Sequence, residues 1–281
     1  MTPAKGFDAL ILDMDGVLLD TRRSFTLATL LSARACAERP GLGEEWTTAE
    51  VERLRLAGGF NNDWDAAAAL CLLAPRSRPG PLWNALCEEL SQRGGGPGAV
   101  RRLVGDVCWE RARREVEPLF QRLYAGPRAF ELYGLEPSER RGLYEEEVPM
   151  VTPCELLEAG LPFGIFTGRT REEAELALDR LGLVLPPERL VCDSEPRFRK
   201  PGPDGLLVLA EALGARRPLH VGDTVDDLRS ALAARAAGLA VRFAGVAPDG
   251  GEAERRLCAE GADAVRSSLR DVLIWMKEEE R

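Results

Sequence analysis

Short apolar runs alternate with helix-like segments through the second half of this sequence, and this alternation constrains the fold more than any other feature. The runs have the length and composition of buried strands, and the segments between them have helical periodicity. Such alternation forms βαβ units, which build a parallel sheet covered by helices. The sequence therefore predicts an α/β protein with strands and intervening helices at residues 163–166, 171–181, 190–192, 203–213, 218–221, 227–237 and 240–243, followed by two closing helices.

Polar residues stand directly after these strands and after one further strand near the N-terminus. The first strand runs through residues 9–12 into two carboxylates, and later strands lead to a hydroxyl, an ammonium and another carboxylate. The residues concerned are Asp13, Asp15, Thr167, Lys200 and Asp223. In an open parallel sheet the ligand crevice lies outside the carboxyl ends of the strands, so we expect these side chains to meet at one place.

A long helical insertion separates the first strand from the rest of the expected sheet. Residues 21–149 show helical periodicity and almost no strand pattern, and segments rich in Gly and Pro divide them. The expected helices are residues 24–38, 48–56, 63–73, 82–92 and 99–124, the last with an interruption near Gly105. An insertion of this length is typical of a separate subdomain, and its place just after the first strand puts it above the crevice.

Composition limits the partners of the chain. The 281 residues carry a net charge of -9, which argues against nucleic acid or an anionic membrane as the main partner. An anionic small substrate remains compatible with this charge, because a local cation can outweigh the global field. The N-terminus has no signal-like or membrane-length apolar stretch, so we expect a cytoplasmic protein. The seven cysteines include no C-x-x-C pair, which argues against a disulfide framework or a structural zinc site.

The use of basic residues singles out Lys200. Of 37 Lys and Arg residues, only Lys5, Lys200 and Lys277 are lysine, and two of these lie near the ends of the chain. We hypothesise that a coding bias has replaced Lys by Arg wherever the exchange is harmless. Lys200 then marks a position that requires a compact ammonium rather than a planar guanidinium.

Four motifs of one enzyme family occur in order along the chain. They are Asp13-x-Asp15-Gly16-Val17, Thr167, Lys200 and Gly222-Asp223-x-x-x-Asp227. With them the whole chain resembles the haloacid dehalogenase superfamily, and in particular its phosphatase-like subfamily IA with a type-1 helical cap. The resemblance implies a Rossmann-like parallel-sheet core of residues 1–20 and 150–281, with an inserted all-helical cap domain of residues 21–149.

The resemblance also implies a role for each catalytic residue. Asp13 would be the nucleophile that forms an aspartyl-phosphate, and Asp15 would protonate the leaving oxygen and later deprotonate the attacking water. Thr167 and the Gly168 amide would bind phosphoryl oxygens. Lys200 would supply positive charge to Asp13 and to the phosphoryl group as the transition state forms.

A metal site is implied as well, because a carboxylate that attacks a phosphate dianion is repelled unless a cation lies between them. Mg²⁺ prefers oxygen ligands, and Asp13, the Asp15 backbone carbonyl and Asp223 would supply them. Asp227 would complete the site directly or through water. The motif spacing favours Asp227 over its neighbour Asp226, which is a spare carboxylate.

The function that follows is a Mg²⁺-dependent phosphatase acting on a phosphate monoester of a small metabolite. A phosphomutase is an alternative, because it uses the same four motifs and differs in keeping the phosphoryl group from water. An alternative of another class is a non-catalytic protein that binds a phosphorylated ligand. The intact motif residues speak against this last alternative, and the substrate itself is left open.

Several residues near the motifs have two interpretations. We expect Arg169 to form a solvated or structural ion pair rather than to touch substrate, and His220 to be a packed strand residue. The insertion also contains a polar loop, residues 58–65, with Asn61, Asn62 and Trp64. Either this loop contacts the leaving group of the substrate, or Asn62 or Asp63 caps a helix and Trp64 packs in the core.

Overall fold

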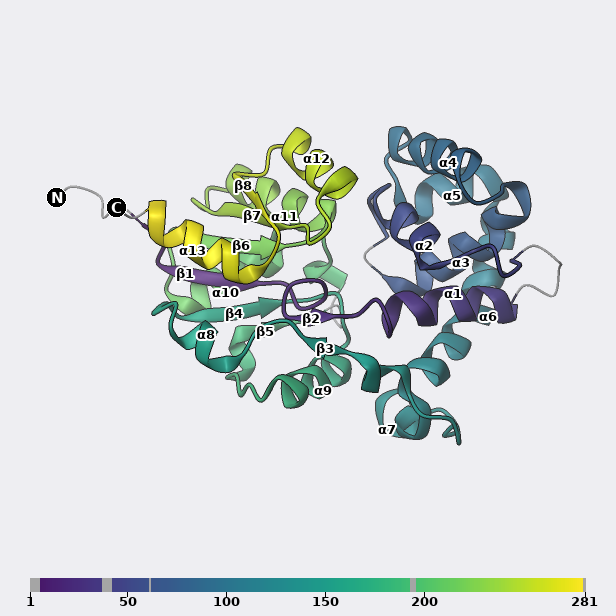
Figure 1. The fold of residues 1–281 in the computed structure, drawn as a ribbon, viewed down its shortest axis with the longest axis horizontal. Coiled ribbons are helices and arrows are strands. Elements are labelled where there is room, and N and C mark those ends of the chain that lie inside the picture. Colours follow the sequence, from purple (N-terminus) through teal and green to yellow (C-terminus); the bar gives the residue numbers. More distant parts are fainter. Residues whose placement is uncertain (1–5, 37–41, 61, 193–195, 280–281) are drawn as a thin grey trace. The chain divides into compact units, whose positions relative to one another are not determined.

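The chain forms two compact units, one made of residues 1–20 and 148–281 and the other of residues 21–147. The computed structural model describes residues 6–36, 42–60, 62–192 and 196–279 (Figure 1). The chain passes between the units after Asp20 and again after Glu147.

A parallel sheet forms the centre of the first unit. In the described residues it has six strands in the order β5-β4-β1-β6-β7-β8, and every neighbouring pair is parallel. The strands are β1 (Ala9–Leu12), β4 (Phe163–Phe166), β5 (Leu190–Val191), β6 (Pro218–Gly222), β7 (Arg242–Val246) and β8 (Ala264–Arg266). Leu12 lies opposite Ile165 of β4 and Val221 of β6, so the residues that follow β1 lie between two strand ends where the strand order changes direction. The predicted α/β fold is confirmed.

Helices cover both faces of this sheet. Side chains along β1 point alternately to its two sides, and apolar side chains on each side are buried against helices. Leu10 and Leu12 belong to a core cluster with residues of α8, α9 and α13, whereas Ile11 packs in a second cluster with residues of α10, α11 and α12 (Figure 1). The helices are α8 (Pro153–Leu157), α9 (Arg171–Leu181), α10 (Asp204–Leu213), α11 (Val225–Ala236), α12 (Gly251–Glu260) and α13 (Leu269–Glu279).

The second unit is helical throughout its described residues, apart from loops and turns. Its helices are α1 (Phe25–Cys36), α2 (Thr48–Arg55), α3 (Asp63–Leu73), α4 (Pro81–Gln92), α5 (Gly96–Val104), α6 (Asp106–Ala125) and α7 (Ala129–Tyr133). Its own core contains three buried tryptophans, Trp46, Trp83 and Trp109. The Trp83 indole N–H donates to the Glu50 carbonyl over 2.9 Å, so its polar atom is satisfied inside that core.

Three expectations about elements and their bounds need correction. Val148 and Pro149, which were expected in the insertion, form β3 (Val148–Pro149), which pairs antiparallel with β2 (Leu19–Asp20) and groups with the sheet unit. The strand expected at residues 240–243 is β7 at Arg242–Val246, and β8 was not expected at all. All three differences arise at strands of two to five residues, which offer too few positions for a periodic pattern.

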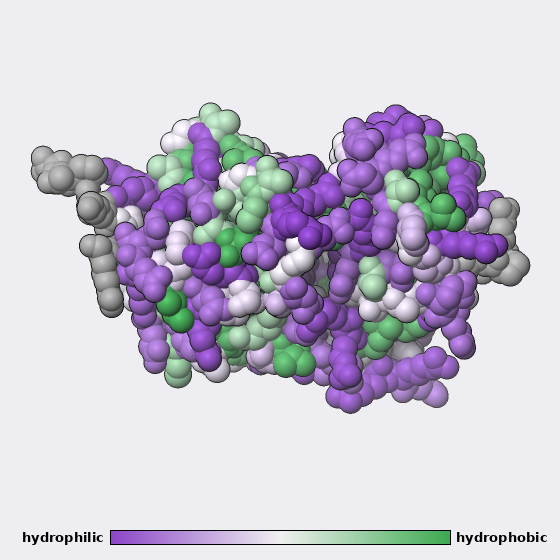
Figure 2. All heavy atoms as spheres, turned by 45° about the horizontal axis from the view of Figure 1, so that its top comes forward, coloured by the Kyte–Doolittle hydropathy of each residue, from purple (hydrophilic) through white to green (hydrophobic). Residues whose placement is uncertain are grey.

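No helix in the described part of the chain is both long and apolar enough to cross a bilayer. The face drawn in Figure 2 is mainly hydrophilic, with hydrophobic residues in small patches.

Candidate active site

Asp13 follows β1 and lies buried at the centre of the sheet edge. Its backbone N–H donates to the Val221 carbonyl of β6 over 2.8 Å, which continues the strand pairing one residue beyond β1. The turn after it depends on Gly16, whose φ of +74° lies in the left-handed region. A Cβ at Gly16 would lie 2.1 Å from the Asp223 carboxylate oxygen Oδ2, so the absence of a side chain there lets Asp223 approach the β1 turn.

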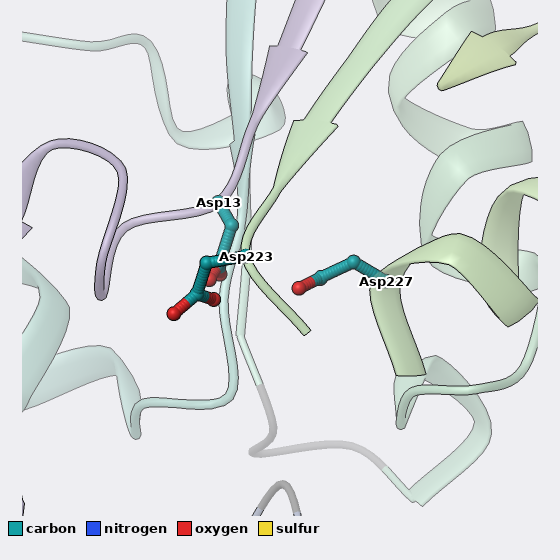
Figure 3. Close-up of side chains that lie close together, drawn as sticks. All are labelled: Asp13, Asp223 and Asp227. Atoms are coloured by element: carbon teal, nitrogen blue, oxygen red, sulfur yellow. The ribbon is translucent and has the colours of Figure 1, made fainter. Parts of the chain in front are cut away.

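Three carboxylates gather at this edge from three different segments. Asp13 follows β1, Asp223 follows β6, and Asp227 lies in the first turn of α11 (Figure 3). One oxygen of each lies within 4.8 Å of the others. Gly222 permits this arrangement as well, because a Cβ there would lie 2.4 Å from the Cβ of Asp227.

Lys200 lies buried between two of these carboxylates. Its Nζ is 2.7 Å from Asp13 Oδ1 and 2.5 Å from Asp227 Oδ1, and the lysine side chain is 1% exposed. The ammonium also stands 4.9 Å from the centre of the Phe166 ring, the last residue of β4. A point charge with three donors therefore joins the segment that follows β5 to the ends of β1 and β4.

Three carboxyl groups of this cluster share one lysine ammonium, and their crowding and burial shift their pKa values. Burial raises the pKa of Asp13 to about 7, with further increases from Asp227 and Asp15, although Lys200 opposes them. Desolvation likewise raises the pKa of Asp223 well above its ordinary value, and Asp13 and Asp227 add to this. Burial acts to lower the pKa of Lys200, but the two carboxylates beside it keep it above its ordinary value.

Asp227 is an exception among the three carboxylates. Its burial would raise its pKa, but Lys200 and His220 more than offset this, so the pKa is lowered. Its Oδ2 accepts hydrogen bonds from the Thr224 hydroxyl over 2.5 Å and the Thr224 N–H over 3.1 Å, which form a capping box at the start of α11. The chain's own donors thus engage both oxygens of Asp227.

The donor set fits a divalent cation of the Mg²⁺ type. Crowded carboxylates with raised pKa values and a single ammonium are the surroundings in which a bound cation relieves repulsion, and all the donors are oxygens. Asp13 and Asp223 are the carboxylates best placed to hold it, with Asp227 behind them against Lys200.

Asp15 is held by a residue that the sequence did not connect with it. Arg169 donates from Nη2 to Asp15 Oδ1 over 2.6 Å and from Nε to the same oxygen over 3.0 Å. The arginine side chain is 1% exposed, so of the two kinds of ion pair expected for Arg169, solvated or structural, the structure has the buried, structural one. The two residues are 154 positions apart, and no local pattern could have indicated their contact.

Thr167 and Gly168 follow β4, next to β1 in the sheet. Thr167 is buried, its N–H donates to the Val191 carbonyl of β5 over 3.0 Å, and its hydroxyl accepts the Arg169 N–H over 3.2 Å. Thr170 then caps α9 with a capping box. Binding of phosphoryl oxygens by Thr167 and Gly168 stays a prediction.

His220 and Asp226 have structural surroundings. His220 is buried in β6, and its Nδ1 lies 2.9 Å from the Ile11 carbonyl oxygen. Its Nε2 is 3.7 Å from Asp227 Oδ1, so this packed strand residue also approaches the carboxylate cluster. Asp226 lies 3.9 Å from Arg229, apart from the group that Asp227 joins.

The polar loop of the helical unit includes a helix cap. Asn62 Oδ1 accepts the backbone N–H groups of Trp64 and Asp65, so Asn62 is the N-cap of α3, as one of the two interpretations expected. The Trp64 ring is partly exposed and lies 5.0 Å from the Arg113 guanidinium rather than deep in the core. Asn61 lies outside the described residues, and substrate contacts by Asn61, Asn62 and Trp64 stay predictions.

Comparison with known proteins relates the chain to several enzymes. It is 28% identical over 244 residues to an imidazoleglycerol-phosphate dehydratase of Phytophthora nicotianae, covering 84% of this chain and 42% of that protein. It is 30% identical over 118 residues to an N-acetylmuramic acid 6-phosphate phosphatase of Pseudomonas aeruginosa, covering 41% of this chain and 50% of that protein. The chain thus spans half or less of the length of these curated relatives.

A solved structure and a family model agree with these similarities. The structure of phosphatase Tt82 from Thermococcus thioreducens is similar over 90% of this chain and 99% of its own, with a TM-score of 0.60 and 26% identity. The model of the family described as haloacid dehalogenase-like hydrolase matches residues 7–235, which include all four motifs. The chain therefore belongs to the haloacid dehalogenase-like hydrolases.

Proposed function

We propose that this protein is a Mg²⁺-dependent phosphatase that hydrolyses a phosphate monoester of a small metabolite through an aspartyl-phosphate on Asp13. The observation that carries the proposal is the buried Asp13 carboxylate, which contacts Lys200 and shares a cluster with Asp223 and Asp227. A nucleophilic carboxylate, a fixed ammonium and a cation site are what phosphoryl transfer to an enzyme side chain requires. The similarity to phosphatase Tt82 and to the phosphatase of Pseudomonas aeruginosa supports the same class of reaction.

The proposed metal would be held by Asp13 and Asp223, with the Asp15 backbone carbonyl as a further ligand and Asp227 behind them. When bound, Mg²⁺ neutralises phosphoryl charge and lets an anionic nucleophile approach. Lys200, whose Nζ lies 2.7 Å from Asp13 Oδ1, would supply a second positive charge, and its burial makes that charge effective because little water screens it.

The covalent steps use Asp13 and Asp15. A carboxylate oxygen of Asp13 attacks phosphorus, the bond from phosphorus to the ester oxygen breaks, and Asp15 gives its proton to the departing alcohol. In the second half, the Asp15 carboxylate takes a proton from water while the water oxygen attacks phosphorus. The bond between phosphorus and Asp13 then breaks, which releases inorganic phosphate and restores both carboxyl groups.

A small phosphorylated metabolite is the proposed substrate class. The chain carries a net charge of -9, so the positive charge for an anionic substrate must come from the site itself, from Lys200 and the cation. The two curated relatives carry the names of phosphorylated small molecules, which agrees with this class. A panel of phosphorylated metabolites, read by phosphate release, would identify the member that this chain prefers.

The proposal is tested by turnover of p-nitrophenyl phosphate. The purified protein should hydrolyse this ester with MgCl₂, lose activity in EDTA and regain it when excess MgCl₂ is added. Full activity in EDTA would overturn the metal requirement. Absence of phosphate release from every ester tested, with Mg²⁺ present, would favour the non-catalytic alternative.

A further inference from the structure

We propose that Arg169 is a positioning residue that holds the Asp15 carboxylate in the orientation needed for its acid and base steps. This inference rests on the proposed phosphatase function. Arg169 follows the Thr167 motif, and in this proposal it acts on Asp15 and does not contact the substrate.

The backbone of Arg169 is placed by the turn between β4 and α9. The Arg169 N–H donates to the Thr167 hydroxyl over 3.2 Å, and Thr170 begins α9 with a capping box. The guanidinium Nη1 also lies 3.4 Å from the Glu173 carbonyl of that helix. The backbone and the guanidinium of Arg169 are therefore each hydrogen-bonded within the sheet unit, so the guanidinium has a defined position.

The contact with Asp15 is made by the fork of the guanidinium. Nη2 and Nε donate to Oδ1 over 2.6 and 3.0 Å, and Nε also lies 3.3 Å from Oδ2. Several donors in a fixed planar group define the rotation of a carboxylate in a way that one ammonium cannot.

Burial separates this pair from an ordinary surface ion pair. The Arg169 side chain is 1% exposed, whereas that of Asp15 is 30% exposed. One side of the carboxylate is thus clamped by the protein, and the other remains open to solvent. A group that must donate a proton to a leaving alcohol and then accept one from water needs this open side.

The two carboxylates that leave β1 have different cations. Asp13 contacts the Lys200 ammonium at 2.7 Å, and Asp15 contacts the Arg169 guanidinium. A compact ammonium leaves room for a phosphoryl group near Asp13, and a fork restricts the rotation of Asp15. Lys200 therefore supplies positive charge beside the nucleophile Asp13, whereas Arg169 fixes the orientation of Asp15, the acid and base.

The test compares two esters that differ in their leaving group. The value of kcat/KM reports the steps up to phosphoryl transfer, and proton donation matters more for phenyl phosphate than for p-nitrophenyl phosphate, whose phenol leaves readily. Arg169→Gln should lower kcat/KM for phenyl phosphate by about 100-fold, the effect expected of a misplaced catalytic group, and for p-nitrophenyl phosphate by less than about tenfold. Arg169→Lys, which keeps the charge without the fork, provides the same comparison in case the Gln variant does not fold.

A double-mutant cycle with Asp15→Asn shows whether Arg169 acts through Asp15. In the Asp15→Asn background, Arg169→Gln should change kcat/KM for phenyl phosphate by less than about twofold, because the group that it positions is already lost. Arg171→Gln is the matched control, since Arg171 lies two residues further on and donates to the Leu190 carbonyl over 3.2 Å. It should keep wild-type rates on both esters.

Two results would overturn the proposal. One is an equal loss of kcat/KM on the two esters, and the other is a full loss from Arg169→Gln in the Asp15→Asn background, since either indicates a structural role. Failure of the phosphatase assignment itself is distinguishable, because the wild-type protein would then hydrolyse neither ester with Mg²⁺.

Discussion

At the scale of single residues, Lys200 is the position where the chemistry demands one side chain. It is buried between Asp13 and Asp227, with the Phe166 ring beside it, in a chain that uses arginine almost everywhere else. Lys200→Arg should lower kcat/KM by at least about 100-fold although the charge is kept, because the larger planar group cannot enter a site packed between two carboxylates. Steady-state kinetics on p-nitrophenyl phosphate measure this.

The matched control for this change is Lys277→Arg, because Lys277 is an exposed lysine whose Nζ lies 3.3 Å from the Glu158 carbonyl. It should keep the wild-type rate. Wild-type kinetics in Lys200→Arg would mean that the survival of Lys200 among so many arginines is accidental.

Gly16 is a second residue whose identity the site demands. Gly16→Ala should lose about 1–2 kcal/mol of stability from the left-handed backbone, and it should also weaken Mg²⁺ binding, because the new Cβ displaces Asp223. Gly214→Ala is the control, since Gly214 has a φ of +64° and open space around it. Thermal unfolding without MgCl₂ should show a larger loss in Gly16→Ala than in Gly214→Ala, because only the Gly16 Cβ meets Asp223, and MgCl₂ should give a reduced shift in Gly16→Ala alone. Equal Mg²⁺ shifts in the two variants would contradict the geometry.

The proximity of site residues was predictable from sequence only where strand ends bring them together. Parallel strands end at one edge, so Asp13, Lys200 and Asp223 could be placed near each other without a structure. The contact between Asp15 and Arg169 could not be predicted, because the two residues are 154 positions apart and the direction of the arginine side chain depends on the turn after β4. The engagement of both Asp227 oxygens also depends on geometry that a motif does not contain.

Among the helices and strands, the start of α3 is where one residue, Asn62, bears both on the stability of the helical unit and on the proposed recognition of substrate. Asn62 Oδ1 accepts two backbone N–H groups at this helix start. Asn62→Ala should therefore lower the free energy of unfolding by about 1 kcal/mol, whereas Asn62→Asp, which keeps an acceptor, should lose much less. Urea unfolding of both variants measures the cap, and kcat/KM for the preferred metabolite measures recognition. An unchanged unfolding free energy in Asn62→Ala would contradict the capping role.

Element bounds followed from sequence where caps are strong. The helices expected at residues 63–73 and 171–181 agree with α3 and α9, because Asn62 and Thr170 cap their first turns and Gly182, in the left-handed region, ends α9. The expected break near Gly105 separates α5 from α6. In contrast, β8 has three residues and pairs only through contacts with β7, so its strand character depends on tertiary structure.

At the scale of the whole molecule, the carboxylate cluster should link stability to pH and metal. Burial raises the pKa of Asp13 to about 7, above the value it has when unfolded. Ionisation of Asp13 therefore costs folding free energy, and the metal-free protein should lose stability as the pH rises from about 4 to about 7. Mg²⁺ binds the ionised carboxylates, so the increase in Tm that MgCl₂ causes should be larger at about pH 8 than at about pH 5.

Differential scanning fluorimetry at the two pH values checks this dependence. Asp13→Asn removes one of the titrating ligands, and its Mg²⁺ shift should differ less between the two pH values. A Mg²⁺ shift in the wild-type protein that is equal at both pH values, or larger at the lower one, would contradict the assignment of the metal to these carboxylates.

The proposed nucleophile of this phosphatase is Asp13, and turnover by Asp13→Asn is the sharpest test of that role. The exchange keeps the size of the side chain and removes the attacking carboxylate, so phosphate release from p-nitrophenyl phosphate with MgCl₂ should fall to background. Asp226→Asn makes the same change at a buried carboxylate outside the cluster and should retain activity. Near wild-type turnover by folded Asp13→Asn would show that Asp13 is not the nucleophile.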